Sequence, residues 1–415
     1  MLFLYKILIN FTLIISPIII ILRIIKKKED PKRFFERYSI ASEKRKSGKL
    51  IWFHGSSVGE ILSIIPLIEI LERDKNINQI LLTSNTLSSS KVFEKLKLKK
   101  TIHQFFPIDS EIIINIFLNY WKPSLVVFVE SEIWPNTINI LNNRRIQKIL
   151  INARITKKSY NNWRLIKKFS YSLFSKFQSC LSQNNETTNY LKKLGANNIK
   201  KIGNLKFSES SFEKKNKISG YKFNYLKSKK ILFGAISTHY NEEILFSKVH
   251  KKLKKQYNNS VSIIVPRHVN RTDEIKNAIE EEGLRVYLHS SKEKKYNKFD
   301  IYLVDTYGEA RSFMKICKVV FLGGSLVKHG GQNPLEAARL GCKVIHGPHV
   351  NNFTEVYNLL NKIKISSKVK NINQAKLKIL KSLNSKFSYS KNIVKLNYLG
   401  KKILLKNKEE IKKYF

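Results

Sequence analysis

Short apolar runs alternate with segments of helical periodicity along most of the chain, and this alternation constrains the fold more than any other feature. In the first half the runs predict strands at Leu50–His54, Gln79–Thr83, Leu125–Val129 and Lys148–Asn152. Helical segments lie between them, including Ile61–Leu71 and Ser90–Leu96. Repeated strand, helix and strand with β-branched runs predict a parallel sheet covered by helices on both faces.

The second half repeats this architecture without repeating the sequence. After a polar stretch, Ser208–Gly220, strands are expected at Lys230–Gly234, Ser262–Val265, Arg285–Leu288, Ile301–Val304, Val319–Leu322 and Lys343–Ile345. The chain has 415 residues, more than a single core usually holds, so two domains are expected. The predicted fold class is therefore α/β, with two doubly wound domains facing across a cleft that is lined by the carboxyl ends of the strands.

A hydrophobic N-terminus precedes the first domain. Residues 7–22, ILINFTLIISPIIIIL, are apolar, and Met1–Tyr5 can extend them past Lys6 toward the roughly 20 residues that span a membrane. Basic residues follow at Arg23 and at positions 26–28, which would place the rest of the chain in the cytoplasm. No cleavage site of small residues follows, so a removable signal peptide is not expected.

A helix lying in the membrane surface is the alternative to a spanning helix. It is suggested by the three residues that interrupt the apolar run, Lys6, Asn10 and Pro17. Either arrangement attaches the protein to a membrane. The predicted organisation is a membrane anchor at residues 1–25, domains at 26–215 and 216–385, and a basic C-terminal helix at 386–415.

The charge and the cysteine content limit which partners the protein can bind and which compartment it can occupy. Lysine and arginine number 77 against 31 acidic residues, and the net charge of +46 attracts the protein to polyanionic surfaces. Nucleic acid, anionic lipid and phosphorylated glycolipid all fit this charge, although the lysines are scattered as on a solvated surface. The three cysteines are far apart and form neither a metal nor a disulfide pattern, which fits a reducing compartment.

The stretch IWFHGSSVGE leads from a strand into a helix through Gly55, Ser56 and Ser57, and then reaches Glu60. Backbone N–H groups at such a turn meet the positive end of the helix dipole, so the turn can hold an anion or a substrate. Ser57 and Glu60 also have the spacing of a capping box, which would only close the helix end. The motif alone leaves both interpretations open and favours the capping box.

A second stretch, FLGGSLVKHGGQNPLEAARLG, is rich in glycine. Gly323–Ser325 offers N–H groups that a phosphate can approach closely. Asn333 is a natural N-cap and Pro334 a natural first helical residue. Glu336 either caps this helix with Asn333 or accepts hydrogen bonds from a ribose diol. The two glycine pairs favour a nucleotide site.

Other strand ends also carry polar side chains. IIVPRHVNR ends a strand with Pro266, Arg267 and His268. Arg267 can pair with a phosphate through its planar fork, although an isolated arginine in so basic a chain is most simply a surface cation. VESEIWPN places Glu130 and Glu132 at another strand end, where we expect one to face the cleft and the other a structural partner. No His-Glu-x-x-His or similar set is present, so the loop histidines are expected to form hydrogen bonds and no metal site is predicted.

Taken together, these stretches resemble the Kdo transferases, the 3-deoxy-D-manno-octulosonic acid transferases of lipopolysaccharide synthesis. The matching segments, in order, are FHGSSVGE, VESEIWPN, NARIT, GNLKF, STHYNEE, PRH, DTYGE, GGSLVKHGGQNPLEAA and GPHVNNF. The resemblance implies a GT-B architecture of two Rossmann-like domains. The N-terminal domain would bind the lipid A precursor and the C-terminal domain CMP-Kdo.

The resemblance also implies a reaction, the transfer of Kdo from CMP-Kdo to the tetra-acylated lipid A precursor with inversion and release of CMP, at the cytoplasmic face of a bacterial inner membrane. Glu60 matches the family's proposed general base, and Glu130 and Lys206 would stabilise the transition state. An ordinary glutamate pKa is about 4.3, so this base needs partial desolvation or a nearby acid. The residues expected to contact CMP-Kdo are Pro266, Arg267, His268, Gly308, Glu309, Ala310, Gly324, Ser325, Asn333, Pro334, Leu335 and Glu336.

Neither a metal nor a cofactor is expected for this reaction, because fixed cations and helix ends would do the electrostatic work. The expected partners are CMP-Kdo, the lipid A precursor and an anionic membrane surface, without nucleic acid. Two positions depart from the family's pattern: Gln332 stands where relatives usually carry histidine, and Ser208 replaces a frequent aspartate. Their effect, the number of Kdo units added, the acyl-chain specificity and the oligomeric state are left open.

Two rival functions remain at this point. A GT-B transferase that uses a UDP-sugar would share the glycine loops and the ribose-binding glutamate, and UDP rather than CMP should protect it thermally. A membrane-tethered nucleic-acid binder would explain the net charge of +46. That function requires a concentrated basic face or stacking aromatic residues, and the sequence shows neither.

Overall fold

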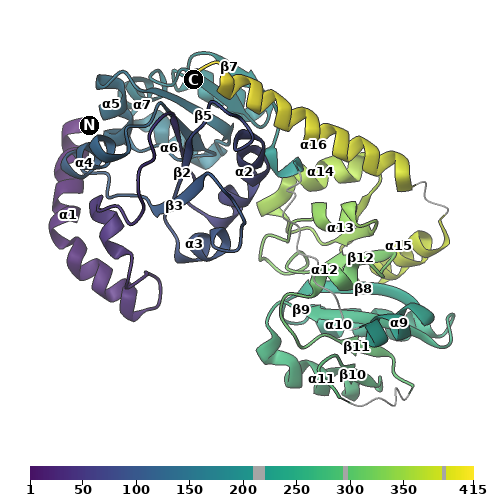
Figure 1. The fold of residues 1–415 in the computed structure, drawn as a ribbon. Helices are drawn as coiled ribbons and strands as arrows, with labels where there is room; N and C mark the ends of the chain where they lie inside the picture. Colours follow the sequence, from purple (N-terminus) through teal and green to yellow (C-terminus); the bar gives the residue numbers. More distant parts are fainter. Residues whose placement is uncertain (209–219, 293–297, 386–388) are drawn as a thin grey trace. The chain divides into compact units, whose positions relative to one another are not determined.

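The structure, a computed structural model, describes residues 1–208, 220–292, 298–385 and 389–415 (Figure 1). It divides into two compact units, one made of residues 1–213 with 397–415 and the other of residues 214–396. The expected domain boundary between residues 215 and 216 lies outside the described residues, as does most of the polar stretch Ser208–Gly220. The predicted domain limits therefore stay predictions.

The first unit contains a seven-stranded parallel sheet with the order β3-β2-β1-β4-β5-β6-β7. Its strands are β1 (Leu50–His54), β2 (Gln79–Ser84), β3 (Thr101–Phe105), β4 (Leu125–Val129), β5 (Gln147–Ala153), β6 (Ser179–Ser182) and β7 (Ile199–Lys201). The strands predicted in this half are all present, while β3, β6 and β7 were not foreseen. This strand order is that of doubly wound dinucleotide-binding folds.

Helices connect these strands and cover the sheet (Figure 1). They are α2 (Val58–Leu71), α3 (Leu87–Phe93), α4 (Glu111–Trp121), α5 (Pro135–Asn143), α6 (Lys157–Leu165), α7 (Lys167–Phe174) and α8 (Asn185–Lys193), with 3₁₀ turns η1 (Phe34–Tyr38) and η2 (Leu205–Phe207). Every residue of β1 and β4 is buried, which requires apolar cover on both faces of the sheet.

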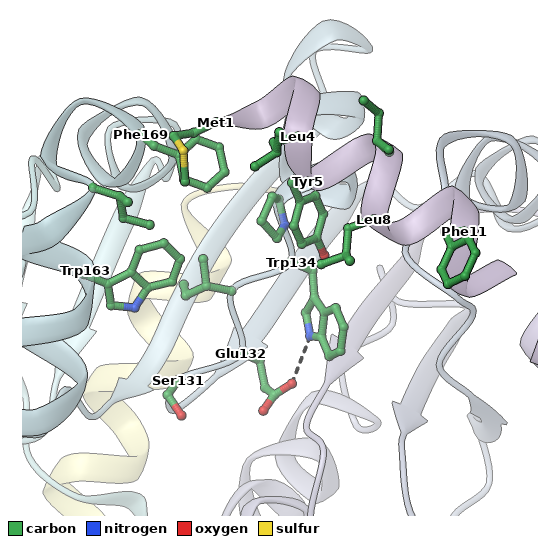
Figure 2. A pocket seen from close by; sticks show the side chains of 14 residues that line it. Met1, Leu4, Tyr5, Leu8, Phe11, Ser131, Glu132, Trp134, Trp163 and Phe169 are labelled. Carbon is green, nitrogen blue, oxygen red and sulfur yellow. Dashed lines mark hydrogen bonds between the residues drawn. The ribbon is translucent and has the colours of Figure 1, made fainter. Parts of the chain in front are cut away.

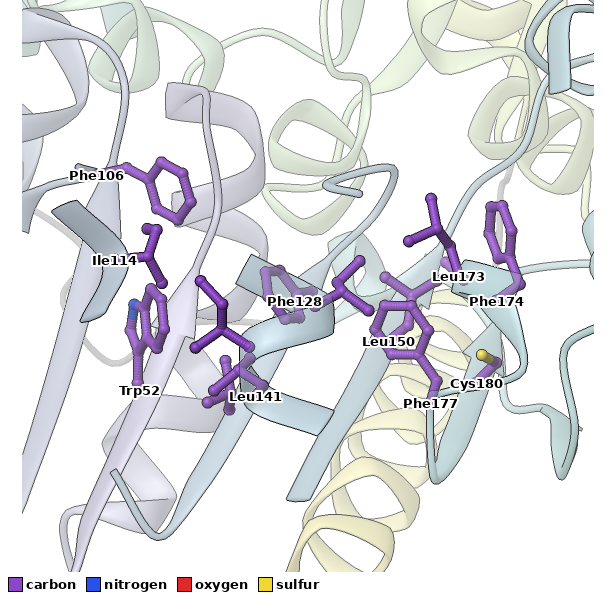
Figure 3. Close-up of a cluster of buried hydrophobic side chains, with 14 of the residues drawn as sticks. Trp52, Phe106, Ile114, Phe128, Leu141, Leu150, Leu173, Phe174, Phe177 and Cys180 are labelled. Carbon is purple, nitrogen blue, oxygen red and sulfur yellow. The ribbon is translucent and has the colours of Figure 1, made fainter. Parts of the chain in front are cut away.

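The core on one face of this sheet is built around Trp52. Its ring centroid lies 4.7 Å from that of Phe117, and both residues belong to one apolar cluster. Figure 3 shows Trp52 with Phe128 and Leu150 of the same cluster. The indole N–H donates to Thr83 Oγ1 at 2.8 Å, so the one polar atom of this large side chain is paired. The cluster fixes β1 and β4 side by side.

The second unit contains another seven-stranded parallel sheet, with the order β10-β11-β9-β8-β12-β13-β14. Its strands are β8 (Lys230–Thr238), β9 (Ser260–Pro266), β10 (Val286–Leu288), β11 (Ile301–Leu303), β12 (Val319–Leu322), β13 (Lys343–His346) and β14 (Ser366–Lys368). Its helices are α9 (Gly220–Ser228), α10 (Glu242–Lys254), α11 (Thr272–Glu281), α12 (Ala310–Met314), α13 (Leu335–Arg339), α14 (Thr354–Lys362) and α15 (Ile372–Asn384), with η3 (Val269–Arg271) and η4 (Asn351–Phe353). The predicted strands are present, and the α/β class with two doubly wound units is confirmed.

The apolar N-terminus forms α1 (Leu2–Ile25), which is long and apolar enough to cross a membrane. Polar contacts hold this helix against the first unit. The Tyr5 hydroxyl donates to Asp109 Oδ2 at 2.8 Å, and Lys6 Nζ pairs with Glu111 at 2.6 Å. One side of α1 thus faces the protein, while most of its apolar side chains are exposed.

The basic C-terminus forms α16 (Tyr389–Lys412), and the second half of this helix packs on the first unit. Lys200 Nζ lies 2.8 Å from Glu410 Oε2. A Cβ built on Gly400 would come within 2.0 Å of the Phe207 carbonyl oxygen, so only glycine permits this close packing. The chain end is therefore part of the first unit.

Strand order reverses between β1 and β4 in the first sheet and between β8 and β12 in the second. In open parallel sheets the loops at such a reversal diverge and leave room for a ligand at the carboxyl edge. The turns after β1 and β4 are therefore neighbours in the first unit, as are the turns after β8 and β12 in the second. These pairs of turns carry most of the polar motifs of the sequence.

Candidate active site

The turn after β1 holds Glu60 at the first turn of α2. Ser57 is the N-cap, and its Oγ accepts from the Glu60 N–H at 3.4 Å. The Glu60 carboxylate accepts from Ser57 Oγ at 2.9 Å and from the Ser56 N–H at 2.7 Å. The cap expected from the spacing therefore forms, yet the Glu60 side chain stays partly exposed at the sheet edge.

The electrostatic surroundings of Glu60 are unusual. Burial, followed by the negative charge of Glu132, raises the pKa of Glu60 to about 7, although the hydrogen bonds from Ser56 and Ser57 act in the opposite direction. The charge of Glu130 adds a smaller effect of the same sign. A carboxylate with a pKa near the operating pH is well suited to general base catalysis. The desolvation and the nearby acid that this role requires are both present.

The turn after β4 holds Glu130, which pairs with Lys206. Glu130 is buried, and its Oε1 lies 2.9 Å from Lys206 Nζ. Its backbone adopts a φ of +56°, a left-handed conformation that is rare for residues other than glycine and concentrates at functional sites. Lys206 lies on η2, where Asn204 accepts its backbone N–H at 2.9 Å. Two residues that are far apart in the sequence are thus brought together at the end of β4, which is the neighbour of β1 in the sheet.

Glu132 belongs to the same turn and contacts the end of β1, where His54 Nε2 lies 3.1 Å from Glu132 Oε2. Trp134 Nε1 donates to the same oxygen at 2.9 Å (Figure 2). Burial raises the pKa of Glu132, but the hydrogen bonds and charge of its partners outweigh burial and hold the pKa below its usual range. Both acids of VESEIWPN therefore have partners in this unit. The sequence did not predict that the charge of Glu132 raises the pKa of Glu60. The only sign of it there was the pair of acids in VESEIWPN.

The buried Arg37 holds the turn after β1 in place through Asn85. Arg37 donates to Asn85 Oδ1 at 3.2 Å and to the Asn85 carbonyl at 2.8 Å. Asn85 Nδ2 in turn donates to Ser56 Oγ at 2.7 Å. Ser56 is the residue whose N–H holds the Glu60 carboxylate, so this chain of contacts fixes the position of the turn.

In the second unit, the turn after β8 is occupied by a carboxylate of the protein itself. Glu242 is 1% exposed and accepts backbone N–H groups from His239 at 2.9 Å and Gly324 at 2.7 Å through Oε2. Its Oε1 accepts from Ser325 at 3.2 Å and from Leu326 at 3.0 Å. The expectation that the N–H groups of Gly324 and Ser325 receive a phosphate is therefore corrected, because Glu242 already fills this position. Contact of either residue with a donor substrate by other atoms stays a prediction.

Basic side chains cluster next to this turn. The ring centroid of His239 lies 4.1 Å from that of His329 and 5.7 Å from that of His268. Burial, together with the neighbouring histidines and Arg267, lowers the pKa of His239 to about 4. Within the described part of the chain, His239 Nε2 is buried without a hydrogen-bond partner. Arg267 and His268 are exposed at the end of β9, as an anion site requires.

The remaining residues expected to contact CMP-Kdo lie around α12 and α13. Glu309 precedes Ala310, the first residue of α12, and its carboxylate accepts from the Thr306 hydroxyl and lies 3.2 Å from His289 Nε2. Gly308 has a φ of +89°, which favours glycine in this turn. Glu336, the acid proposed for a ribose, also has a protein partner, because it pairs with Arg311 at 3.0 Å.

The start of α13 differs by one residue from the expectation. Pro334 is the N-cap and Leu335 the first helical residue. The reason is that Asn333 Oδ1 accepts from the Leu335 N–H at 3.1 Å, which closes a turn before the helix begins. Glu336 bonds to Arg311 rather than acting as the capping partner of Asn333.

A metal centre is not evident in the described residues, where no group of three or more His, Cys, Asp and Glu side chains is placed to hold an ion. Histidines at the strand ends hydrogen bond instead. His54 Nδ1 lies 3.0 Å from Thr83 Oγ1, and His346 Nδ1 lies 2.7 Å from the Gly347 carbonyl. The independence of the reaction from metal stays a prediction.

Known structures show the same fold. A putative UDP-N-acetylglucosamine 2-epimerase from Listeria monocytogenes superimposes with a TM-score of 0.59 at 14% identity, over 88% of this chain and 98% of that one. The glycotransferase of kitacinnamycin gives a TM-score of 0.54 at 10% identity, over 89% and 100% of the two chains. The fold is thus that of GT-B-type glycosyltransferases and related epimerases.

Sequence comparison then identifies the family. The model of the 3-deoxy-D-manno-octulosonic-acid transferase (kdotransferase) family matches residues 32–209. The 3-deoxy-D-manno-octulosonic acid transferase of Rickettsia bellii (strain RML369-C) is 32% identical over 408 residues, which is 96% of each chain. The chain belongs to the Kdo transferase family and is a glycosyltransferase.

Proposed function

We propose that this protein transfers Kdo from CMP-Kdo to the tetra-acylated lipid A precursor in lipopolysaccharide biosynthesis, at the cytoplasmic face of a bacterial inner membrane. The observation that carries the proposal is the Glu60 carboxylate, which is partly exposed at the sheet edge and has its pKa raised to about 7. Membership of the Kdo transferase family and the apolar helix α1 support the donor sugar and the membrane location.

In the proposed step, a glucosamine hydroxyl of the acceptor attacks the anomeric carbon of Kdo. Glu60 takes the hydroxyl proton as the new carbon–oxygen bond forms. The bond between the anomeric carbon and the phosphate oxygen breaks, CMP leaves with the electron pair, and the configuration inverts. Glu130 positions Lys206, whose ammonium group would neutralise the Kdo carboxylate or the departing phosphate.

The donor would be held by the second unit. Arg267 supplies positive charge for the phosphate of CMP, and the neighbouring rings of His268 and His239 offer nitrogen atoms for hydrogen bonds to the donor. Pro266, Gly308, Glu309, Ala310, Gly324, Ser325 and the segment Asn333–Glu336 complete the proposed donor site. In this proposal charged side chains neutralise the leaving group, and transfer proceeds without a metal or a cofactor.

Mass spectrometry of the products tests the reaction. Purified full-length protein is incubated with CMP-Kdo generated in situ and the tetra-acylated lipid A precursor, with and without EDTA. Products that gain one or two Kdo masses in both conditions are expected. The Glu60→Gln variant should form product at least about 100-fold more slowly, while CMP still raises its melting temperature and UDP does not. The proposal fails if the wild-type protein forms no product, or if Glu60→Gln is fully active.

A further inference from the structure

We infer that the apolar pocket between α1 and the turn after β4 binds one acyl chain of the acceptor lipid, so that the N-terminal helix is a wall of the substrate site as well as a membrane attachment. This inference rests on the proposed function and adds to it the position of the lipid tail. It is carried by the pocket, by its position beside Glu132 and by the charge around it.

The pocket is large and apolar (Figure 2). Its volume is about 760 Å³, within the roughly 300–1,000 Å³ that is common for small-molecule sites. Its wall is formed by Leu4, Leu8 and Phe11 of α1 and by side chains of α6 and α7, among them Trp163 and Phe169. An acyl chain fits such a lining because it has no polar atom to satisfy.

The pocket is lined by exposed apolar side chains of α1, the helix that is suited to a membrane. Leu4, Leu8 and Phe11 are 64%, 62% and 60% exposed, and they follow one another at helical spacing. They line the pocket from a helix that has the length and composition of a membrane span. A lipid tail can therefore pass from the bilayer into the pocket without crossing water.

The pocket borders the turns that carry the candidate catalytic residues. Glu132 lines the pocket, and the same carboxylate binds His54 and Trp134. His54 is the last residue of β1, and the turn that follows it carries Glu60. A lipid whose tail lies in the pocket has its sugar near the proposed base. This position favours the acceptor over a phospholipid of the bilayer, which has no sugar to place there.

The charge around the pocket complements a phosphorylated glycolipid. Exposed basic side chains lie on and next to the helices that form the far wall: Lys157, Lys158, Arg164, Lys167 and Lys168. The apolar side chains Trp163, Ile166 and Phe169 of the same segments line the pocket. Acyl and anionic groups of one molecule can therefore contact this segment together.

Two matched pairs of substitutions in α1 test the inference. Leu4→Asn with Leu8→Asn removes apolar side chains from the pocket, and Ile14→Asn with Ile18→Asn removes equally exposed ones outside it, at 76% and 64% exposure. The first pair should raise the KM for the acylated acceptor about tenfold or more, because apolar contact with the chain is lost. Its KM for CMP-Kdo, and its activity on a deacylated acceptor, should equal those of the wild type. The second pair should leave all three unchanged.

Binding is measured separately from transfer by fluorescence. Trp134 and Trp163 line the pocket, whereas Trp52 and Trp121 are fully buried in the core. Acceptor with brominated acyl chains should quench the wild-type protein and the control pair, and should quench the Leu4→Asn, Leu8→Asn variant much less. Equal effects of the two pairs, or quenching by brominated phosphatidylglycerol that the acceptor does not displace, would overturn the inference. If the brominated acceptor binds as expected but wild-type transfer is absent, the proposed reaction fails and the acyl site stands.

Discussion

The turn after β1 and the turn after β8 lie at equivalent positions, each at the strand reversal of its sheet, and each carries a glutamate at the start of the next helix. Glu242 is 1% exposed and accepts four backbone N–H groups. Glu60 accepts one backbone N–H and one hydroxyl and is partly exposed. A glutamate at this position is structural where four N–H groups occupy its carboxylate, as in Glu242. It is available for catalysis where fewer donors contact it, as in Glu60.

The turns after β1 and β8 also differ in how each holds its carboxylate. In the second unit the anion at the strand reversal is the carboxylate of Glu242, which ties the turn after β8 to the loop after β12. In the first unit the carboxylate of Glu60 is only partly exposed and lies near other acids, and burial followed by repulsion from Glu132 raises its pKa.

The largest expected effect is on catalysis by Glu60, the partly exposed glutamate. Glu60→Gln keeps the shape of the side chain but removes the proton acceptor. We expect kcat to fall by about 10²–10⁴-fold, the range of general base catalysis, with little change in melting temperature. Steady-state kinetics with the acylated acceptor measure this. A loss of less than about threefold would mean that another group takes the proton.

The next effect is on stability at the buried glutamate. Glu242→Ala leaves four backbone N–H groups without their acceptor, three of them on buried residues. We expect the free energy of unfolding to fall by about 3–5 kcal/mol, whereas Glu60→Ala should cost only about 1 kcal/mol, as for the loss of a helix cap. Urea denaturation of the two variants gives the comparison. Equal losses would contradict the distinction between the two turns.

A smaller effect is expected at the ion pair next to Glu60. Lys206→Met leaves the buried Glu130 carboxylate without its 2.9 Å partner. We expect a loss of about 1–3 kcal/mol, part of which returns in the Glu130→Gln, Lys206→Met double variant. A double-mutant cycle by urea denaturation measures the coupling. Additive losses would show that the pair contributes no coupling energy to the native state.

The smallest effect is a dependence of stability on pH. The folded pKa of Glu60, about 7, is above its unfolded value, so the folded state binds more protons between about pH 4.5 and 7. This group therefore makes the protein more stable as pH falls through that window, and less stable as pH rises. Across this window Glu60→Gln should remove a change of about 1–2 kcal/mol in the free energy of unfolding. This value is reduced because the group is partly exposed. Parallel slopes in wild type and variant would contradict the raised pKa.

Much of the fold was predictable because strands such as β1 and β4 are continuous apolar runs. The strand β3 was missed because its sequence, TIHQF, includes Thr101, His103 and Gln104, which are polar yet buried. The strands β7 and β14 were missed because their sequences, IKK and SSK, are mainly polar, whereas the equally short strands β10 and β11 are apolar and were predicted. Strand assignment from apolar runs thus fails where most of the strand is polar, whether its side chains are buried or lie at a sheet edge.

The candidate site was only partly predictable, for a different reason. The spacing of Ser57 and Glu60 predicted the cap that forms, since this contact is local. The contact of His54 with Glu132 spans 78 residues, and that of Glu242 with Gly324 spans 82. Such contacts depend on which strands are neighbours in the sheet, and no local pattern encodes them. The roles of Glu60, Glu130 and Lys206 came from the family resemblance, and they stay predictions.

The pH dependence of kcat/KM for the acylated acceptor tests the central claim most directly. If Glu60 is the base and its environment raises its pKa, the rate should be constant above about pH 7 and fall about tenfold per pH unit below it. Glu132→Gln should shift this limb to lower pH, because the charge of Glu132 contributes to the raised pKa. A wild-type profile that stays flat down to about pH 5, where an ordinary glutamate is still ionised, would contradict the account.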